Sequence, residues 1–234
     1  RARAMPKLLA VGLRFADCIV AVSDGVADDL AAELGLDRAR IEVVYNPVDV
    51  ARLTEAAARP AEVDWPPGTG PRLLAVGRLI EQKDFPTLLR AVAELSEARL
   101  LVLGDGELRP ALEALAEELG VAARVRFAGL VDNPFPLFRA ADVFVLSSAW
   151  EGLPTVVIEA LALTPRIVAT DCPSGPREIL GVGRWGRLVS VGDADALARG
   201  VIEELATPLR DRDGALARYD RGAVTDRYLA LVRT

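Results

Sequence analysis

The fold is decided by residues 142–163, which read DVFVLSSAWEGLPTVVIEALAL. The apolar run predicts a buried strand at 142–146, and small residues follow it. Pro154 and Thr155 then begin a helix at 155–163, with proline in the first turn, where a missing N–H costs little. First-turn amides are unpaired and the helix dipole favours negative charge. The sequence therefore predicts an anion site at the start of this helix.

Strands and helices alternate regularly on both sides of this stretch. Strands are expected at 72–76, 99–103, 124–128, 142–146, 166–170 and 187–189, and helices at 85–96, 107–119, 155–163, 195–205 and 224–232. Such alternation predicts an α/β fold with a doubly wound parallel sheet. We expect residues 51–71 to be poor in helix, with an exposed linker at 66–71 that is rich in proline and glycine.

The first 45 residues are expected to form a helix, strand, helix and strand. The first helix is expected at 4–15 and the first strand at 18–22. The second helix is expected from Ser23 or Asp24 to Leu34, where Gly35 ends it. The second strand is expected at 41–45, before a turn at 46–49. These residues are too few for a core of their own.

Composition excludes several classes of function. The chain has 234 residues, a net charge of -6 and no basic run, which argues against a nucleic-acid partner. It has no histidine, so a Ser-His-Asp triad and a histidine-ligated metal are excluded within this chain. Its two cysteines, Cys18 and Cys172, fit a reducing compartment rather than a disulfide framework. No apolar run is long enough to span a membrane.

Two pairs of aspartates have the spacing of a metal-binding Asp-x-Asp. Asp193 and Asp195 are interpreted as a helix cap and first turn, and Asp211 and Asp213 as part of a charged helical region. We therefore expect no metal site.

Two carboxylates flank the start of the 155–163 helix. Glu151 precedes it, and Glu159 follows Thr155 by four residues, so Glu159 and Thr155 share one face of the helix. Carboxylates repel phosphate but accept hydrogen bonds from sugar hydroxyls. A ligand that carries both groups, such as a nucleotide sugar, fits this pattern.

Unusual residues follow five of the predicted strands. Because the carboxyl ends of parallel strands meet at one edge, where ligands bind, these loops predict one site. They are Gly77-Arg78, Gly104-Asp105-Gly106, Gly129 with Val131, the Glu151 loop, and residues 171–176.

Arg78 and Lys83 place two cations after the first strand of the sheet. Arginine binds a diphosphate as a fork and lysine binds it as a point charge. Gly104 and Gly106 indicate either a close approach of the backbone to a ligand or a tight turn, and the sequence leaves both open. No Gly-x-Gly-x-x-Gly is present, which argues against a nicotinamide or flavin dinucleotide.

The segment from Glu151 to Ala160, Glu-Gly-Leu-Pro-Thr-Val-Val-Ile-Glu-Ala, resembles the Glu-x7-Glu motif of the retaining family-4 glycosyltransferases of the GT-B fold. Gly77-Arg78-Leu79 and Gln82-Lys83 are similar to the family's diphosphate motif. Three positions depart from the pattern: Asp84, Ser174 and Thr164 stand where the family commonly has glycine. Pro165 can end the helix in place of a glycine at 164.

The resemblance implies a role for each candidate residue. Arg78 and Lys83, beside Gly77, would hold the donor pyrophosphate, Glu151 would contact the donor sugar, and Glu159 would accept the ribose hydroxyls. Backbone amides of Gly152, Leu153 and Thr155 would address sugar and phosphate, whereas Pro154 has no N–H to offer. The remaining donor-side positions are Gly104, Gly106, Val131 and the loop that ends at Glu178. No cofactor beyond the donor is implied.

The resemblance also implies two parts: residues 1–50 as a remnant of the acceptor lobe and residues 51–234 as the donor lobe. The expected function is transfer of a hexose or N-acetylhexosamine, with retention, to a glycan or lipid-linked hydroxyl. Arginine-rich, lysine-poor usage suggests a bacterial enzyme of envelope glycan synthesis, in the cytoplasm or at the inner face of the membrane, with peripheral membrane contact left open. We expect the chain to bind donor but to transfer poorly without a complete first lobe.

Two other classes stay open. One is a related GT-B enzyme such as a sugar-nucleotide epimerase or a phosphorylase; a phosphorylase would need a pyridoxal-phosphate lysine, and only Lys7 and Lys83 are present. The other is a non-catalytic nucleotide-binding module. The sequence does not identify the base, the sugar or the acceptor.

Overall fold

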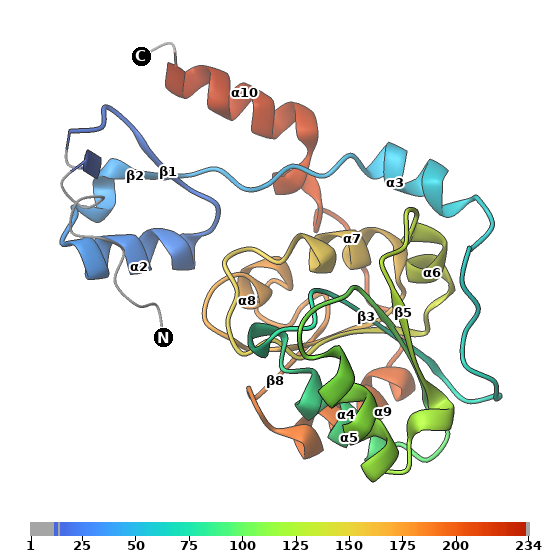
Figure 1. Ribbon diagram of the computed structural model, residues 1–234. Helices are drawn as coiled ribbons and strands as arrows, with labels where there is room; N and C mark the ends of the chain where they lie inside the picture. The colour runs from blue at the N-terminus through green and yellow to red at the C-terminus, as the bar shows by residue number, and fades with distance from the viewer. Residues whose placement is uncertain (1–11, 14, 233–234) are drawn as a thin grey trace.

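The computed structural model describes residues 12–13 and 15–232 of the chain (Figure 1). The strands are β1 (Ile19–Ala21), β2 (Ile41–Val43), β3 (Arg72–Val76), β4 (Arg99–Leu103), β5 (Val125–Gly129), β6 (Val143–Leu146), β7 (Ile167–Thr170) and β8 (Arg187–Val189). The helices are α2 (Asp24–Leu34), α3 (Val50–Ala57), α4 (Phe85–Glu94), α5 (Arg109–Glu118), α6 (Phe135–Ala140), α7 (Thr155–Leu163), α8 (Pro176–Ile179), α9 (Ala194–Ala206) and α10 (Arg221–Val232). Short 3₁₀ helices lie at η1 (Arg38–Arg40), η2 (Glu81–Lys83), η3 (Ala122–Arg124) and η4 (Ala217–Tyr219).

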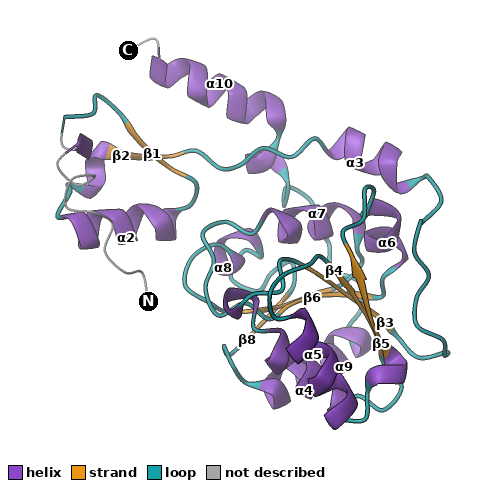
Figure 2. Ribbon diagram, viewed as in Figure 1, coloured by secondary structure: helices purple, strands orange, loops and turns teal. Residues whose placement is uncertain are grey.

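The main sheet is parallel and has the strand order β5-β4-β3-β6-β7-β8 (Figure 2). The chain builds outward from β3 to β5, then returns to the centre and builds outward in the other direction from β6 to β8. This order confirms the predicted doubly wound α/β fold. It also makes β3 and β6 neighbours at the point where the strand order reverses, which is where such sheets bind ligands.

Helices cover both faces of the sheet, so its inner strands β4, β3, β6 and β7 are buried on both sides, whereas the edge strands β5 and β8 are half-exposed (Figure 1). Successive residues of β3 show the alternation: Leu73 and Ala75 pack into the core shared with α4, α5 and α9, whereas Leu74 packs into the core shared with α6 and α7. Strands buried on two faces need continuous apolar sequence. This explains why the strands could be predicted from short apolar runs.

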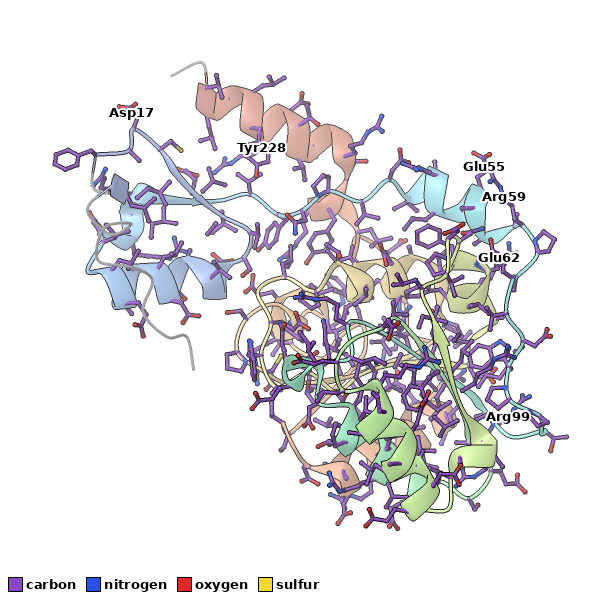
Figure 3. The ribbon with its side chains drawn as sticks, in the orientation of Figure 1. Asp17, Glu55, Arg59, Glu62, Arg99 and Tyr228 are labelled. Atoms are coloured by element: carbon purple, nitrogen blue, oxygen red, sulfur yellow. The ribbon has the colours of Figure 1, made fainter. Side chains whose placement is uncertain are left out.

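The prediction that residues 51–71 are poor in helix is wrong over α3. Asp49, expected in a turn, instead caps this helix by accepting a hydrogen bond from the Arg52 amide at 3.0 Å. Leu53 and Ala57, one turn apart, bury against α6 and α7. The exposed face of α3 carries Glu55 and a weak ion pair to Arg59 at 3.7 Å (Figure 3).

Two further short helices, α6 and α8, were not expected from the sequence. Both are under seven residues long, and each has a proline in its first turn, so neither shows a helical period. Thr164 has an extended backbone before Pro165, and α7 ends at the predicted residue. The helix predicted at 4–15 falls mostly outside the described residues.

The N-terminal segment folds as β1, α2 and β2, with a two-stranded parallel sheet and a small cluster of buried residues around Ile19, Ala27 and Ile41. α10 lies beside it (Figure 1), where Arg227 pairs with Glu42 at 2.6 Å. Among residues 12–13 and 15–232, no helix is both long and apolar enough to cross a membrane.

Candidate functional site

The loops that follow β3 and β6 meet because these two strands are neighbours. The Ala149 amide donates to the carbonyl of Gln82 at 2.8 Å, and the Ser147 hydroxyl donates to the carbonyl of Lys83 at 2.7 Å. These two bonds join η2 to the loop before α7. They bring the predicted cation Lys83 to the predicted carboxylate Glu151.

Lys83 and Glu151 form a buried ion pair, with Nζ 2.5 Å from Oε1. The Glu151 side chain is 7 % exposed and that of Lys83 is 15 % exposed, so little water screens the pair. Ser148, itself fully buried, donates its hydroxyl to the same carboxylate oxygen at 2.7 Å. Gln82 donates to the second oxygen at 3.3 Å and to the carbonyl of Trp150 at 2.9 Å. Glu151 is therefore held in one orientation by three side chains.

Arg78 differs from Lys83 in its surroundings. It follows β3 and Gly77 in the chain and is exposed, and within the described residues its side chain has no hydrogen-bond or ion-pair partner. An arginine in this position keeps all five of its N–H donors for a ligand.

The start of α7 presents amides that have no partner in the described part of the chain. Pro154 provides no side-chain cap, and the amides of Gly152, Leu153, Thr155 and Val156 make no hydrogen bond. Leu153 is buried, and buried amides in proteins are nearly always paired, with water or a ligand where no protein group is available. The geometry of an anion site is thus present at the predicted helix start.

Glu159 lies on the second turn of α7, partly buried. No other side chain or amide in the described residues contacts its carboxylate through a hydrogen bond or an ion pair. Burial raises the pKa of Glu159 from 4.5 to about 7. The charge of a desolvated carboxylate that lacks hydrogen-bond donors is stabilised most by a ligand that supplies such donors.

Packing accounts for the glycines predicted on the donor side. Gly104 has φ +124°, and a Cβ there would lie 2.0 Å from the carbonyl oxygen of Gly77; a Cβ on Gly106 would lie 2.5 Å from that of Leu79. These glycines allow the loops after β3 and β4 to pack together, and their donor-side role stays a prediction. Val131 is half-buried against the core and shows no polar feature of a site.

Two of the three departures from the family pattern adopt the conformation that glycine favours. Asp84 has φ +43° and Ser174 has φ +64°, both in the left-handed region. Asp84 also caps α4 by accepting from the Thr87 amide at 3.4 Å. The backbone path after Lys83 therefore survives the substitution, because aspartate tolerates this region better than most residues.

Sequence reasoning assigned no role to Gln82 or Ser148, and it treated Ser23 only as a helix cap. Gln82 and Ser148 lie within three residues of the motif carboxylate or its lysine, so proximity to the motif was the available signal. Ser23 had no such signal, because its hydroxyl bonds to the carbonyl of Gly152, 129 residues away, at 2.8 Å.

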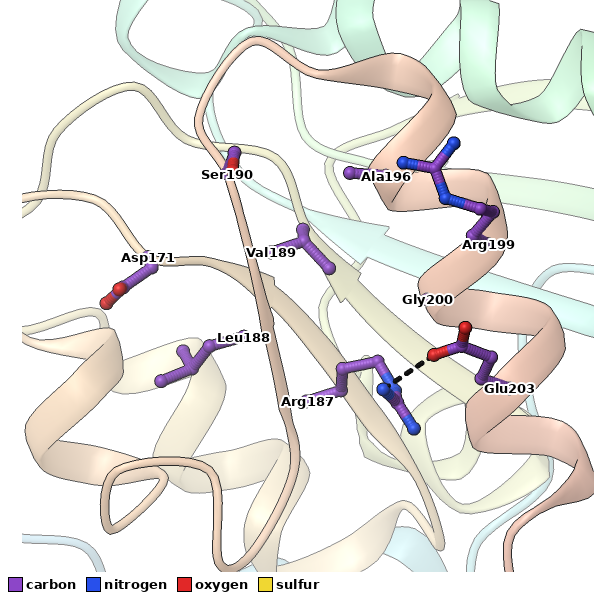
Figure 4. A pocket seen from close by; sticks show the side chains of 9 residues that line it. All are labelled: Asp171, Arg187, Leu188, Val189, Ser190, Ala196, Arg199, Gly200 and Glu203. Atoms are coloured by element: carbon purple, nitrogen blue, oxygen red, sulfur yellow. Dashed lines mark ion pairs between the residues drawn. The ribbon is translucent and has the colours of Figure 1, made fainter.

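Two cavities lie away from Lys83 and Glu151. One of about 490 Å³ lies between β8 and α9, where Arg187 pairs with Glu203 at 2.7 Å (Figure 4). Of the loops predicted at the site, only the one at 171–176 reaches it, through Asp171. A second cavity, of about 450 Å³, lies where α2 faces the loop before α8.

The aspartate pairs are structural. Asp193 caps α9 by accepting from the Ala196 amide at 2.8 Å, as predicted. Asp211 and Asp213 lie in a loop, so their assignment to a helical region is wrong. The described residues contain no group of three or more His, Cys, Asp or Glu side chains that could hold a metal ion.

Comparison with protein-family models gives the family. The model described as glycosyl transferases group 1 matches residues 70–207, more than half of the chain, and includes every predicted site residue. The chain belongs to the group 1 glycosyltransferases. A second model, glycosyltransferase family 4, matches residues 1–52 of this glycosyltransferase chain.

Curated relatives of this glycosyltransferase include bacterial enzymes of glycan synthesis. The lipopolysaccharide core biosynthesis glycosyltransferase LpsE of Rhizobium meliloti is 38% identical over 226 residues, which cover 94% of this chain and 65% of LpsE. A Campylobacter jejuni N-acetylgalactosamine-N,N'-diacetylbacillosaminyl-diphospho-undecaprenol 4-alpha-N-acetylgalactosaminyltransferase is 32% identical over 187 residues, covering 80% of this chain and 50% of the enzyme. The chain thus spans about half to two-thirds of the length of these relatives.

Solved structures agree on the GT-B fold. The lipopolysaccharide outer core galactosyltransferase WaaB superposes with a TM-score of 0.75 at 26% identity, over 94% of this chain and 62% of WaaB. Anabaena HepE, solved with UDP and glucose, superposes with a TM-score of 0.81 at 19% identity, over 97% of this chain and 66% of HepE. The HepE likeness shows the fold alone.

Proposed function

We propose that this chain is the donor-binding part of a retaining glycosyltransferase that moves a hexose or N-acetylhexosamine from a nucleoside diphosphate sugar to a hydroxyl of a glycan or lipid-linked acceptor. Bacterial envelope glycan synthesis is the proposed setting, supported by the names of LpsE and the Campylobacter enzyme. The observation that carries the proposal is the buried Lys83–Glu151 pair at the reversal of strand order, beside an uncapped helix start.

In this proposal the diphosphate binds between the α7 amides and the two cations. Arg78, whose exposed side chain has no partner among the described residues, forms a fork to the phosphate oxygens, and Lys83 adds a point charge. Lys83 can serve both groups because its ammonium has three donors, and only one is needed for Glu151. Glu159 accepts the two ribose hydroxyls, and Glu151 accepts from the donor sugar.

The proposed reaction breaks the bond between sugar C1 and the phosphate oxygen and forms a bond from C1 to the acceptor oxygen. Positive charge develops on the sugar ring and negative charge on the departing phosphate. Arg78, Lys83 and the dipole of α7 stabilise the departing phosphate, and the carboxylate of Glu151 stabilises the ring. The acceptor hydroxyl gives its proton to the departing phosphate, so no general base is assigned within this chain.

Calorimetric titration with UDP-, GDP- and ADP-sugars tests the proposal. We expect one of these series to bind, and Arg78→Ala to weaken its affinity roughly 10- to 100-fold, the worth of a hydrogen bond to a charged group. Arg199→Ala, an exposed arginine on α9, is the matched control and should leave the affinity unchanged. Unchanged affinity in Arg78→Ala would remove the diphosphate assignment, and a chain that binds none of the series would refute the function.

Release of nucleotide from the bound donor separates an enzyme from a binding module. A slow hydrolysis that yields nucleoside diphosphate and sugar would support the enzyme, and Glu151→Gln should reduce its rate at least tenfold. Binding with no nucleotide release, even with mixed acceptors present, would favour the non-catalytic module.

A further inference from the structure

The N-terminal helix α2 contacts the donor loop directly. The Ser23 hydroxyl, fully buried, donates to the carbonyl of Gly152 at 2.8 Å and accepts the amide of Val26 at 3.1 Å. One side chain therefore caps α2 and bonds to the loop between Glu151 and α7. This contact joins residues 129 positions apart.

Glu178, just after the glycine-containing turn before α8, holds the same helix end. Its two carboxylate oxygens accept hydrogen bonds from the amides of Asp24 and Gly25, each at 3.0 Å. Glu178 and Ser23 together accept hydrogen bonds from the first three backbone amides of α2. A Cβ on Gly25 would lie 2.4 Å from the Ser174 hydroxyl, so only glycine permits this approach of the two segments.

The bond to the Gly152 carbonyl determines where the next amide points. The described chain has no cis peptide bond, and in a planar trans peptide the C=O and N–H point in opposite directions. Because the Gly152 carbonyl faces Ser23, the Leu153 N–H faces away from α2. Leu153 is a buried residue, and its amide has no hydrogen-bond partner in the part of the chain that the structure describes.

We propose that Ser23 is a positioning residue that orients the Leu153 amide toward the donor, with Glu178 holding α2 in place for it. The inference rests on the proposed function and extends it, since donor binding in the 51–234 region then depends on a side chain from the 1–50 segment. Ser23 itself touches no donor; it acts through the peptide between Gly152 and Leu153.

Substitutions at Ser23 can separate its two bonds. Ser23→Asp keeps an acceptor for the Val26 amide, as aspartate caps helices well, but in its ionised form it cannot donate to the Gly152 carbonyl. Ser23→Thr keeps both functions, and Ser23→Ala removes both. Asp193→Ala, which removes the cap of α9 on the opposite face of the sheet, is the control for loss of a helix cap alone.

Triple-resonance NMR of the unliganded chain is the first test. We expect the Gly152 carbonyl and Leu153 amide-nitrogen resonances to shift in Ser23→Asp and Ser23→Ala and to stay near wild type in Ser23→Thr and Asp193→Ala. Unmoved resonances in Ser23→Asp and Ser23→Ala would overturn the inference. This measurement needs no ligand, so it tests the effect of Ser23 on the Gly152–Leu153 peptide independently of the proposed function.

Titration of the same variants with UDP, GDP and ADP is the second test. For the diphosphate that wild type binds, we expect Ser23→Asp and Ser23→Ala to lose affinity roughly fivefold, the worth of one well-aimed hydrogen bond, and Ser23→Thr to restore it. Equal affinity in wild type and in Ser23→Asp would overturn the positioning role. Binding of none of the three by wild type would instead count against the proposed function.

Discussion

Glu159 is a carboxylate in a desolvated position, and no donor from the described residues stabilises its charge. Its pKa of about 7 means that it is about half protonated at neutral pH. Only the ionised form accepts from both ribose hydroxyls with a charged oxygen each, so binding should be strongest above pH 7 and binding at neutral pH should release protons. Because the folded pKa is raised, the group's contribution to stability in the free chain is present below pH 4.5 and is lost as pH rises through about 7.

The affinity for the nucleotide sugar that binds should therefore fall roughly 20-fold from about pH 7.5 to about pH 5.5, because the ionised fraction of Glu159 falls by that factor. Calorimetry over this range checks it, and a nucleotide sugar is the right probe because its diphosphate does not titrate there. Glu159→Gln should bind more weakly at high pH and lose most of the dependence. A wild-type profile that is flat below pH 7 would contradict this role for the carboxylate.

Val182 carries backbone strain that its side chain does nothing to offset. It has φ +56°, which is a genuine outlier for a β-branched residue, and its side chain is 71 % exposed. Val182→Gly should raise the free energy of unfolding by about 1 kcal/mol. Urea unfolding followed by tryptophan fluorescence measures it. Val191→Gly, whose valine has no positive φ, is the control and should lower stability; a loss in both variants would show that no strain is stored at Val182.

At the scale of the element, α7 is anchored at its carboxyl end by one arginine from a distant loop. The Arg212 guanidinium donates to the carbonyls of Thr164 at 2.6 Å, Pro165 at 3.0 Å and Leu161 at 3.4 Å. Burial lowers the pKa of Arg212 to about 10, so it stays charged at neutral pH. A cation at the carboxyl end of a helix complements the dipole that serves an anion at the amino end.

Arg212→Ala should lower the free energy of unfolding by about 2–3 kcal/mol, since three carbonyls lose a charged donor. Arg212→Lys should recover only part of this, because a single ammonium cannot span the carbonyls that the guanidinium reaches. Thermal and urea unfolding measure both. Arg199→Ala, at an exposed position, should change stability by under about 0.5 kcal/mol. A similar small change in Arg212→Ala would show that the anchor is unimportant.

At the scale of the molecule, the two cores of the main sheet share their strands, whereas the β1–α2–β2 segment has its own small cluster. The free energy of local opening should therefore be lower in the β1–α2–β2 segment than in the main sheet, because few buried apolar contacts hold the smaller unit. Hydrogen bonds at Ser23 and Glu178, exposed ion pairs such as Arg227–Glu42, and packing of Val22 against the main core join it to the rest.

Amide hydrogen exchange should show this division. We expect the amides of β1 and β2 to exchange at least tenfold faster than those of β3, β6 and β7. Glu178→Gln should widen this difference in exchange rate, because it weakens the hydrogen bonds to the amides of α2. Asp193→Ala should leave the difference unchanged. Equal protection of both sheets would mean that the molecule opens as one cooperative unit.

Residue patterns alone determined the parallel α/β fold, the bounds of α7 and the loop edge at which the motif residues fall. These features depend on short-range causes: strands buried on two faces need apolar runs, and Pro165 disfavours a helical conformation at the residue before it. The charged and carboxylate members of the candidate site, Arg78, Lys83, Glu151 and Glu159, could be named on the same grounds together with the family resemblance.

Only the tertiary structure decided which loops meet. α3 forms because Leu53 and Ala57 find α6 and α7, and Lys83 reaches Glu151 across 68 residues because β3 and β6 are neighbours in the sheet. Ser23 reaches Gly152 across 129 residues for the same kind of reason. Pairings of this kind depend on strand order and on the packing of distant segments, and no local sequence period carries that information.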